Sequence, residues 1–300
     1  MYSSETSQFE KPELSVIIAS YNSRLTIRHC LESLRNQATE KPFEMIVVDS
    51  STDGTAEFVE KEFPRVRVLS FPERKFCGGA RNEGVSAAKA DTVAFIDSDC
   101  IADENWVDEI LKAHVDEDLA VGGSISNRQP CNWVSWSAYF CEFSKWMPGT
   151  PDSVMGDVAG ANMSYKKRVF HEVGRFIENT YCSDTEFHWR MAGFKCQVRF
   201  VPAICITHES INRFWAFIRH EFCHGRFFAR VRVKSKRFSK TRRFAYAVLS
   251  CAVPFKLLLE ICLVNLKNRI YIGHFLKSFP GVFVGLISWS AGECCGYIKS

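Results

Sequence analysis

The chain of 300 residues has thirteen cysteines but lacks the paired spacings of disulfide frameworks and structural zinc sites. No CxxC motif occurs and the count is odd. Cys205, Cys251 and Cys262 lie inside apolar runs, where a thiol acts as a small hydrophobic group. The first residues lack a basic start followed by an apolar core, so we expect no signal peptide. These absences favour a reducing, cytoplasmic location.

A clean membrane-spanning run is also lacking, because such a helix needs about 20 apolar residues with few charges. Two apolar stretches, 244–266 and 270–292, are each interrupted by charged residues. They follow a stretch, 226–243, that contains nine Lys or Arg and no acid. This pattern predicts an amphipathic helical hairpin in the interface on the cytoplasmic side of a membrane. The alternative is a soluble helical subdomain whose basic face is solvated.

The net charge of +4 conceals an uneven distribution along the chain. Residues 1–225 carry 24 Lys/Arg and 32 Asp/Glu, a net of −8, whereas residues 226–300 carry 14 and 2, a net of +12. A basic tail favours an anionic partner. Since no nucleic-acid-binding module accompanies the charge, we expect a membrane surface and no nucleic acid.

Apolar runs of strand length are abundant in the first hundred residues. Residues 14–20, 45–49 and 92–97 are rich in β-branched side chains, as is typical of parallel strands buried on both faces. Segments with helical spacing lie among them, at 23–37, 55–63 and 79–90. Repeated strand–helix–strand units predict right-handed crossovers and a layered α/β fold. Ligands bind at the carboxyl ends of the strands in such sheets.

The strongest chemical signal is Asp97-Ser98-Asp99, at the end of the predicted strand 92–97. Carboxylate oxygens suit Mg²⁺ or Mn²⁺, and Mg²⁺ is usually held by one or two carboxylates together with substrate phosphates. A chain that leaves a strand can turn both carboxylates towards one ligand. The sequence therefore predicts a divalent metal site at Asp97 and Asp99.

Other segments carry weaker signals, each with a structural alternative. Asp49 ends a strand and is placed to meet a ligand, whereas Asp53 suits a helix cap. Arg81, in the glycine-rich helix start 78–84, offers a fork of donors for phosphate or is simply a surface arginine. Asp184, at another helix start, is a candidate general base or only a favourable partner of the helix dipole.

Seven segments, taken in order, resemble a family-2 glycosyltransferase with the GT-A fold. They are SVIIASYN (15–22), VVDSSTDGT (47–55), GGARNEG (78–84), DSD (97–99), GANMSYKKRVFHEVGRF (160–176), SDTEFHWRMAGF (183–194) and VPAICITH (201–208). The resemblance implies a three-layer α/β/α sandwich with a mostly parallel sheet at 13–212. A flexible segment, 1–12, would precede it, and a basic, apolar helical region, 213–300, would follow.

The same resemblance implies roles for particular residues. Those that would bind the nucleotide sugar are Ala19, Tyr21, Asp49, Arg81 and Asp97. Those that would hold the metal, Mn²⁺ or Mg²⁺, are Asp97, Asp99 and His208. Asp184 would be the catalytic base, and Gly160 and Asn162 would border the acceptor.

The implied enzyme transfers one sugar, with inversion, from a nucleotide-diphosphate sugar, UDP being the commonest nucleotide. The acceptor would be a hydroxyl of a glycan or a lipid-linked molecule in polysaccharide biosynthesis. Ser183 replaces the glutamate that usually precedes the base, and the Gln-x-x-Arg-Trp motif of processive polymerases is absent, which favours single addition. One alternative is a catalytically silent member that binds a sugar nucleotide or tethers partners to the membrane. Another is a phosphotransferase with Asp97 as nucleophile, although Ile101 stands where such sites usually place a hydroxyl.

Overall fold

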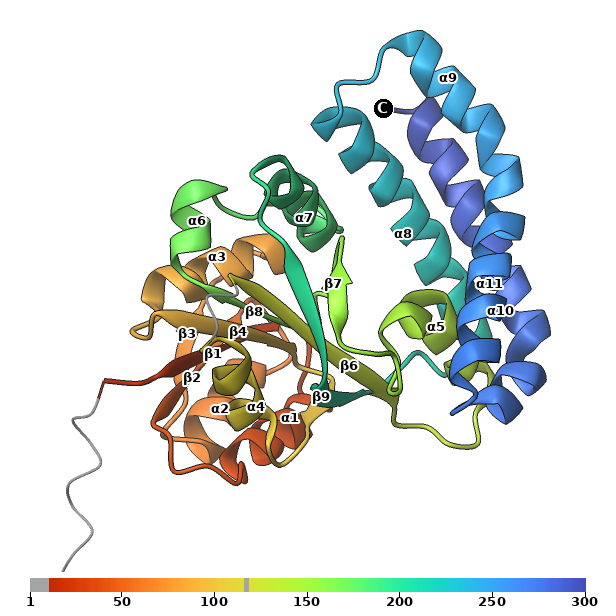
Figure 1. Ribbon diagram of the computed structural model, residues 1–300. Helices are drawn as coiled ribbons and strands as arrows, with labels where there is room; N and C mark the ends of the chain where they lie inside the picture. Colours follow the sequence, from red (N-terminus) through yellow and green to blue (C-terminus); the bar gives the residue numbers. More distant parts are fainter. Residues whose placement is uncertain (1–10, 116–118) are drawn as a thin grey trace, which may run out of the picture. The chain divides into compact units, whose positions relative to one another are not determined.

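The structure is a computed structural model that describes residues 11–115 and 119–300. The chain divides into two compact units (Figure 1). The first unit holds the β-sheet and six helices, and the second holds α5 and the helices from α8 onwards.

The first half of the sheet is parallel, as the apolar runs predict. Its strands are β1 (Leu14–Ser20), β2 (Phe43–Asp49), β3 (Arg67–Ser70) and β4 (Thr92–Asp97). They lie in the order β3-β2-β1-β4 and all pair in parallel. The runs at 14–20 and 92–97 are strands over their whole predicted length, and their central side chains are buried.

The second half of the sheet makes it a mixed sheet. Its strands are β5 (Cys100–Ala102), β6 (Ala120–Asn127), β7 (Ser153–Met155), β8 (Asn162–Lys166) and β9 (Val198–His208). The order continues from β4 as β8-β6-β9-β5, and β7 pairs with β9. β8 is antiparallel to both β4 and β6, so it closes the parallel half.

Helices cover both faces of this sheet (Figure 1). They are α1 (Ile27–Arg35), α2 (Thr55–Glu62), α3 (Cys77–Ala87), α4 (Trp106–Ala113), α6 (Arg168–Glu172) and α7 (Ser183–Gly193). Figure 1 shows α1, α2 and α4 on one side of the sheet, and α3, α6 and α7 on the other. The predicted three-layer α/β/α sandwich is therefore confirmed.

The second unit is built on two helices that pack closely. Its elements are α5 (Trp133–Phe143), α8 (Phe214–Ser235), α9 (Lys240–Leu249), α10 (Val253–Asn268) and α11 (Ile272–Ile298). A Cβ atom on Gly225 of α8 would lie 2.0 Å from the carbonyl oxygen of Trp289, and one on Gly292 of α11 would lie 2.0 Å from that of Phe222. Because only glycine permits such a close approach, the contact between α8 and α11 requires Gly225 and Gly292.

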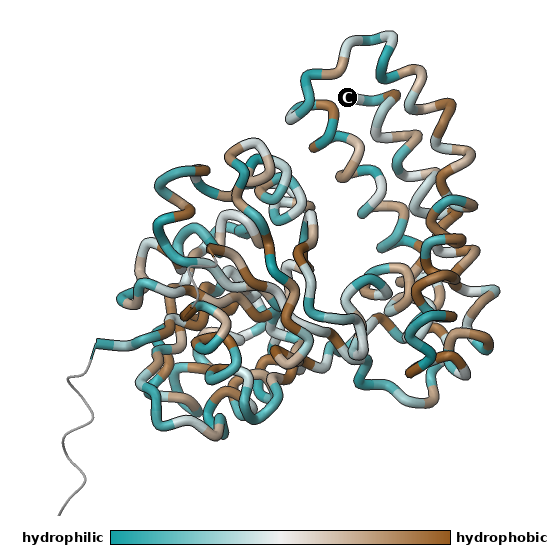
Figure 2. Tube along the Cα trace, viewed as in Figure 1, coloured by the Kyte–Doolittle hydropathy of each residue, from teal (hydrophilic) through white to brown (hydrophobic). Residues whose placement is uncertain are grey.

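Two stretches of the second unit are long and apolar enough to cross a membrane, 240–268 and 272–298. In the first only 22% of the apolar window is buried, against 50% in the second. Figure 2 shows apolar segments along α10 and α11. Because α11 also forms the core of the unit, its length and composition are weak evidence of a membrane span.

The close approach of α3 to β1 gives a test of the first unit. A Cβ atom on Gly84 would lie 2.3 Å from Cγ2 of Ile17, which is fully buried. Gly84→Ala should therefore overpack the core and lower the free energy of unfolding by about 1–3 kcal/mol in chemical denaturation. Gly193→Ala is the control, because nothing lies within 4 Å of its Cβ position. Equal stability of the two variants would contradict this packing.

Candidate active site

Three predicted site residues meet at the carboxyl ends of neighbouring parallel strands. Ala19 of β1 stands opposite Asp97 of β4, and Ser20 of β1 stands opposite Asp49 of β2. Tyr21 follows directly after β1, and the guanidinium of Arg74 lies 4.2 Å from the centroid of its ring. The register of the sheet thus brings Ala19, Asp49 and Asp97 to one edge, and Tyr21 directly follows the end of β1.

The turn after β2 holds Asp49 in a fixed orientation. Asp49 is buried, and its two carboxylate oxygens accept hydrogen bonds from the backbone N–H of Ser51 at 3.0 Å and from its hydroxyl at 2.6 Å. Asp53 accepts a hydrogen bond from the backbone N–H of Thr55, the first residue of α2. Asp53 thus binds the first N–H of α2, although the N-cap position itself is occupied by Gly54.

Arg81 is a buried cation at the centre of the site, and not a surface arginine. Its side chain is 5% exposed, and its Nη2 donates to Oδ1 of Asp97 at 3.1 Å and to the carbonyl oxygen of Gly160 at 3.0 Å. Burial alone would lower the pKa of Arg81, but Asp97 and then Cys77, Asp184 and Tyr165 raise it above its ordinary value. The guanidinium is therefore charged throughout the physiological pH range.

Asp184 lies beside this cation. A Cβ atom added to Gly160 would stand 2.6 Å from Oδ2 of Asp184 and 3.0 Å from Nη2 of Arg81, so all three groups share one small space. Asp184 is the second residue of α7, whose first residue, Ser183, packs against Gly78 of α3. The N-terminal ends of α3 and α7 therefore bring Arg81 and Asp184 together.

Glu186, two residues further along α7, has a different environment. Its carboxylate is buried and paired with Nε of Arg190 at 2.9 Å. Nη2 of Arg190 donates in turn to the carbonyl oxygen of Arg175. Glu186 is thus part of a structural ion pair, which leaves Asp184 as the acid of this segment that faces the site.

Cys77 is a neighbour of the site that the sequence analysis missed. It is the first residue of α3. Cys77 is exposed. Partial desolvation by the surrounding protein still raises the pKa of its thiol; Arg81 lowers this pKa, and Asp97, Asp184 and Asp99 raise it further. The charges of these three acids therefore all influence the same thiol. The sequence gives no signal for Cys77, because this cysteine belongs to none of the paired spacings that indicate a disulfide or a metal site.

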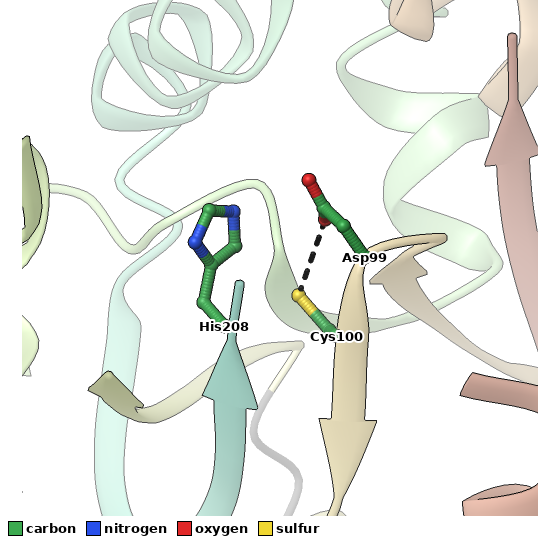
Figure 3. A group of neighbouring side chains, drawn as sticks. All are labelled: Asp99, Cys100 and His208. Atoms are coloured by element: carbon green, nitrogen blue, oxygen red, sulfur yellow. Dashed lines mark hydrogen bonds between the residues drawn. The ribbon is translucent and has the colours of Figure 1, made fainter. Parts of the chain in front are cut away.

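Two of the three predicted metal ligands, Asp99 and His208, lie together beside two neighbouring strands, whereas Asp97 ends β4, pairs with Arg81 and is not in this group. Figure 3 shows Asp99 and Cys100 at the start of β5 and His208 at the end of β9, which adjoins β5 in the sheet. The three form a group of possible metal ligands. Sγ of Cys100 donates to Oδ1 of Asp99, and burial, followed by the charge of Asp99, raises the pKa of this thiol well above its ordinary value. Cys100 is therefore a neutral thiol.

Asn162 has a structural environment at the start of β8. Its side-chain amide donates to the carbonyl oxygens of Ser124 at 3.0 Å and Ile204 at 2.9 Å, and its Oδ1 accepts from Nε1 of Trp106. The side chain is 1% exposed and ties three elements together. The acceptor-binding role assigned to Asn162 stays a prediction.

Comparison with known proteins agrees with the resemblance of the sequence. Residues 15–174 match the model of the family described as "Glycosyl transferase family 2". EpsH of Bacillus subtilis (strain 168) is 37% identical over 116 residues, which are 37% of this chain and 33% of EpsH. The glycosyltransferase AglE of Haloferax volcanii is 28% identical over 185 residues, 59% of this chain and 60% of AglE. The chain thus spans between a third and three fifths of these two relatives.

A solved structure shares the fold. The mannosyltransferase PcManGT of Pyrobaculum calidifontis, in complex with GDP-Man and Mn²⁺, superposes with a TM-score of 0.64 at 17% sequence identity. The match covers 95% of this chain and 88% of PcManGT. With the family match across more than half of its residues and the acidic strand ends described above, the chain belongs to glycosyl transferase family 2.

Proposed function

We propose that the chain transfers a single sugar from a nucleotide-diphosphate sugar to an acceptor hydroxyl, with inversion at the anomeric carbon. The observation that carries this proposal is the buried guanidinium of Arg81, which binds Asp97 and Gly160 beside the carboxylate of Asp184. A fixed cation next to an acid supplies the two functions that the transfer needs, charge stabilisation at the leaving group and proton removal from the acceptor.

In this mechanism Asp184 accepts the proton of the acceptor hydroxyl as its oxygen forms a bond to the anomeric carbon. The bond between that carbon and the diphosphate oxygen breaks at the same time, and its electron pair leaves with the nucleoside diphosphate. Arg81 stabilises the negative charge that develops there, since its guanidinium is charged and already held in place. Ala19, Tyr21 and Asp49 border the nucleoside.

A divalent metal fits the donor set. Asp99 and His208 lie in one group of possible metal ligands, and Asp97, which pairs with Arg81, would add a second carboxylate. Carboxylate oxygens suit Mn²⁺ and Mg²⁺. We propose that these residues hold it; when bound, the metal neutralises the leaving diphosphate. The Mn²⁺ in the complex of PcManGT supports this assignment, and its GDP-Man makes GDP-sugars candidates beside the UDP-sugars favoured above.

Asp184→Asn tests the proposed base, because the amide keeps the shape of the side chain and cannot accept the proton. We expect the release of nucleoside diphosphate from UDP- and GDP-sugars, with Mn²⁺ present and water as acceptor, to fall by about 10²–10⁴-fold. Binding of the sugar nucleotide, measured by calorimetry, should remain. Asp103→Asn, which changes an exposed acid of the same unit, is the matched control. Near-normal turnover in Asp184→Asn would remove this residue from the mechanism.

We also propose that the second unit attaches the protein to the cytoplasmic face of an anionic membrane, close to glycan or lipid-linked acceptors. The support is an apolar stripe on α10, where Phe255, Leu259 and Leu263 recur at every fourth position and are each about 60% exposed. The basic residues of α8 and α9 precede this stripe in the sequence. Each Lys or Arg near an anionic membrane surface adds about 1 kcal/mol to the free energy of membrane binding.

Leu259→Glu should weaken binding to vesicles that contain phosphatidylglycerol by about tenfold or more in a sedimentation assay. Loss of one buried leucine costs roughly 1.5–3 kcal/mol in such a transfer. Leu25→Glu is the matched control, since Leu25 is 90% exposed on the first unit. Equal binding of the two variants would show that the stripe on α10 does not contact the membrane.

A further inference from the structure

The second unit contains a cluster of titratable residues that the proposed transfer does not use. On α8, residues His220-Glu221-Phe222-Cys223-His224 follow the HExxH spacing, which places two imidazoles one helical turn apart on the same face. The spacing is weak evidence on its own, because it also occurs by chance. Here a third group, the carboxylate of Glu142 on α5, joins it.

One distance within this cluster matches the spacing of two ligands around one metal ion. Nε2 of His220 lies 3.2 Å from Oε1 of Glu142. Two ligands bound at about 2.0 Å to a tetrahedral Zn²⁺ are roughly 3.3 Å apart. One ligand atom from each of Glu142, His220 and Glu221 lies within 4.8 Å of the others, and the ring of His224 lies 5.9 Å from that of His220 between centroids.

Glu221 supplies a second, independent observation. Its side chain is 2% exposed, and its Oε1 has no hydrogen-bond partner among the residues that the structure describes. A buried carboxylate oxygen without a partner is costly unless a proton or a cation satisfies it. A cation bound at the cluster would satisfy this oxygen.

We propose that Glu142, His220 and Glu221 bind a divalent transition-metal ion, Zn²⁺, with His224 as an additional imidazole ligand. Imidazole and carboxylate together suit Zn²⁺ better than Mg²⁺ or Ca²⁺, which take oxygen ligands. The ion neutralises Glu221 and links α5 to α8. This site lies within the second unit and is separate in its ligands from the site proposed at Asp97 and Asp99.

A cavity beside the cluster gives an ion and water access to it. The cavity has a volume of about 500 Å³ and is lined in part by Tyr181, Trp215, Arg219 and His220. All of its lining residues belong to the second unit. His220 therefore connects the buried carboxylate of Glu221 with solvent.

Co²⁺ binding tests this proposal, since Co²⁺ replaces Zn²⁺ and absorbs visible light. The test uses the full chain with Asp99→Asn, which disables the other proposed metal site, after treatment with a chelator. Titration with Co²⁺ should give visible bands that saturate at one ion per chain, without the near-ultraviolet band of a cobalt–thiolate bond. Addition of Zn²⁺ should remove these bands.

Glu142→Gln, added to the same background, should weaken Co²⁺ binding by more than the loss of roughly 10–100-fold that follows removal of an outer-shell partner. His29→Ala, which removes an exposed imidazole of α1, is the control and should bind as before. Far-ultraviolet circular dichroism checks that each variant is folded.

Three outcomes would overturn the proposal. They are the absence of visible bands from the Asp99→Asn protein, the presence of the cobalt–thiolate band beside them, and Co²⁺ binding by Glu142→Gln that is as tight as in its parent. The first result does not depend on the folding of a cluster variant. It would mean that a proton on Glu221, and not a metal ion, balances the charge of the cluster.

Discussion

The buried guanidinium of Arg81 is the charge on which the arrangement of the first unit depends. A cation that is 5% exposed needs anionic and carbonyl partners, and it finds them in Asp97 at the end of β4 and in Gly160 before β8. Asp184 approaches the same point, because Gly160 has no side chain to keep it away. The distance between the proposed leaving-group cation and the proposed base is thus set by backbone packing, which holds both in place before a substrate arrives.

The parallel half of the fold and most of the site follow from local sequence patterns. Continuous β-branched runs predict β1 and β4 over their whole length. Asp49 of β2 and Asp97 of β4 both stand beside the end of β1, with which both strands pair. The antiparallel pairing of β8 with β4 and β6 and the buried network of Asn162 were not predictable in the same way. They depend on partners far away in the sequence, Trp106, Ser124 and Ile204, and no local pattern records such pairings.

In the second unit, even more of the structure depends on contacts between distant residues that local sequence patterns do not record. The aromatic segment at 133–143 gave no sign that it is a helix of the C-terminal unit, because its partners on α11 are more than a hundred residues away. The HExxH spacing of residues 220–224 is visible in the sequence, but these residues become a candidate metal site only because Glu142 of α5 lies next to them. Burial of Glu221 is likewise a property of packing. In both units, then, local pattern identifies candidate groups, and tertiary contacts decide which of them act together.

The central claim is that Arg81, Asp97, Asp99 and Asp184 serve one donor-binding site. A crystal structure of the protein with Mn²⁺ and either UDP or GDP, recorded with anomalous scattering at the manganese edge, tests it most directly. The account predicts a manganese peak at the carboxylates of Asp97 and Asp99, with the diphosphate bound between the metal and Arg81 and the nucleoside next to Asp49. A nucleotide bound elsewhere on the chain, with no manganese at Asp97 or Asp99, would contradict it.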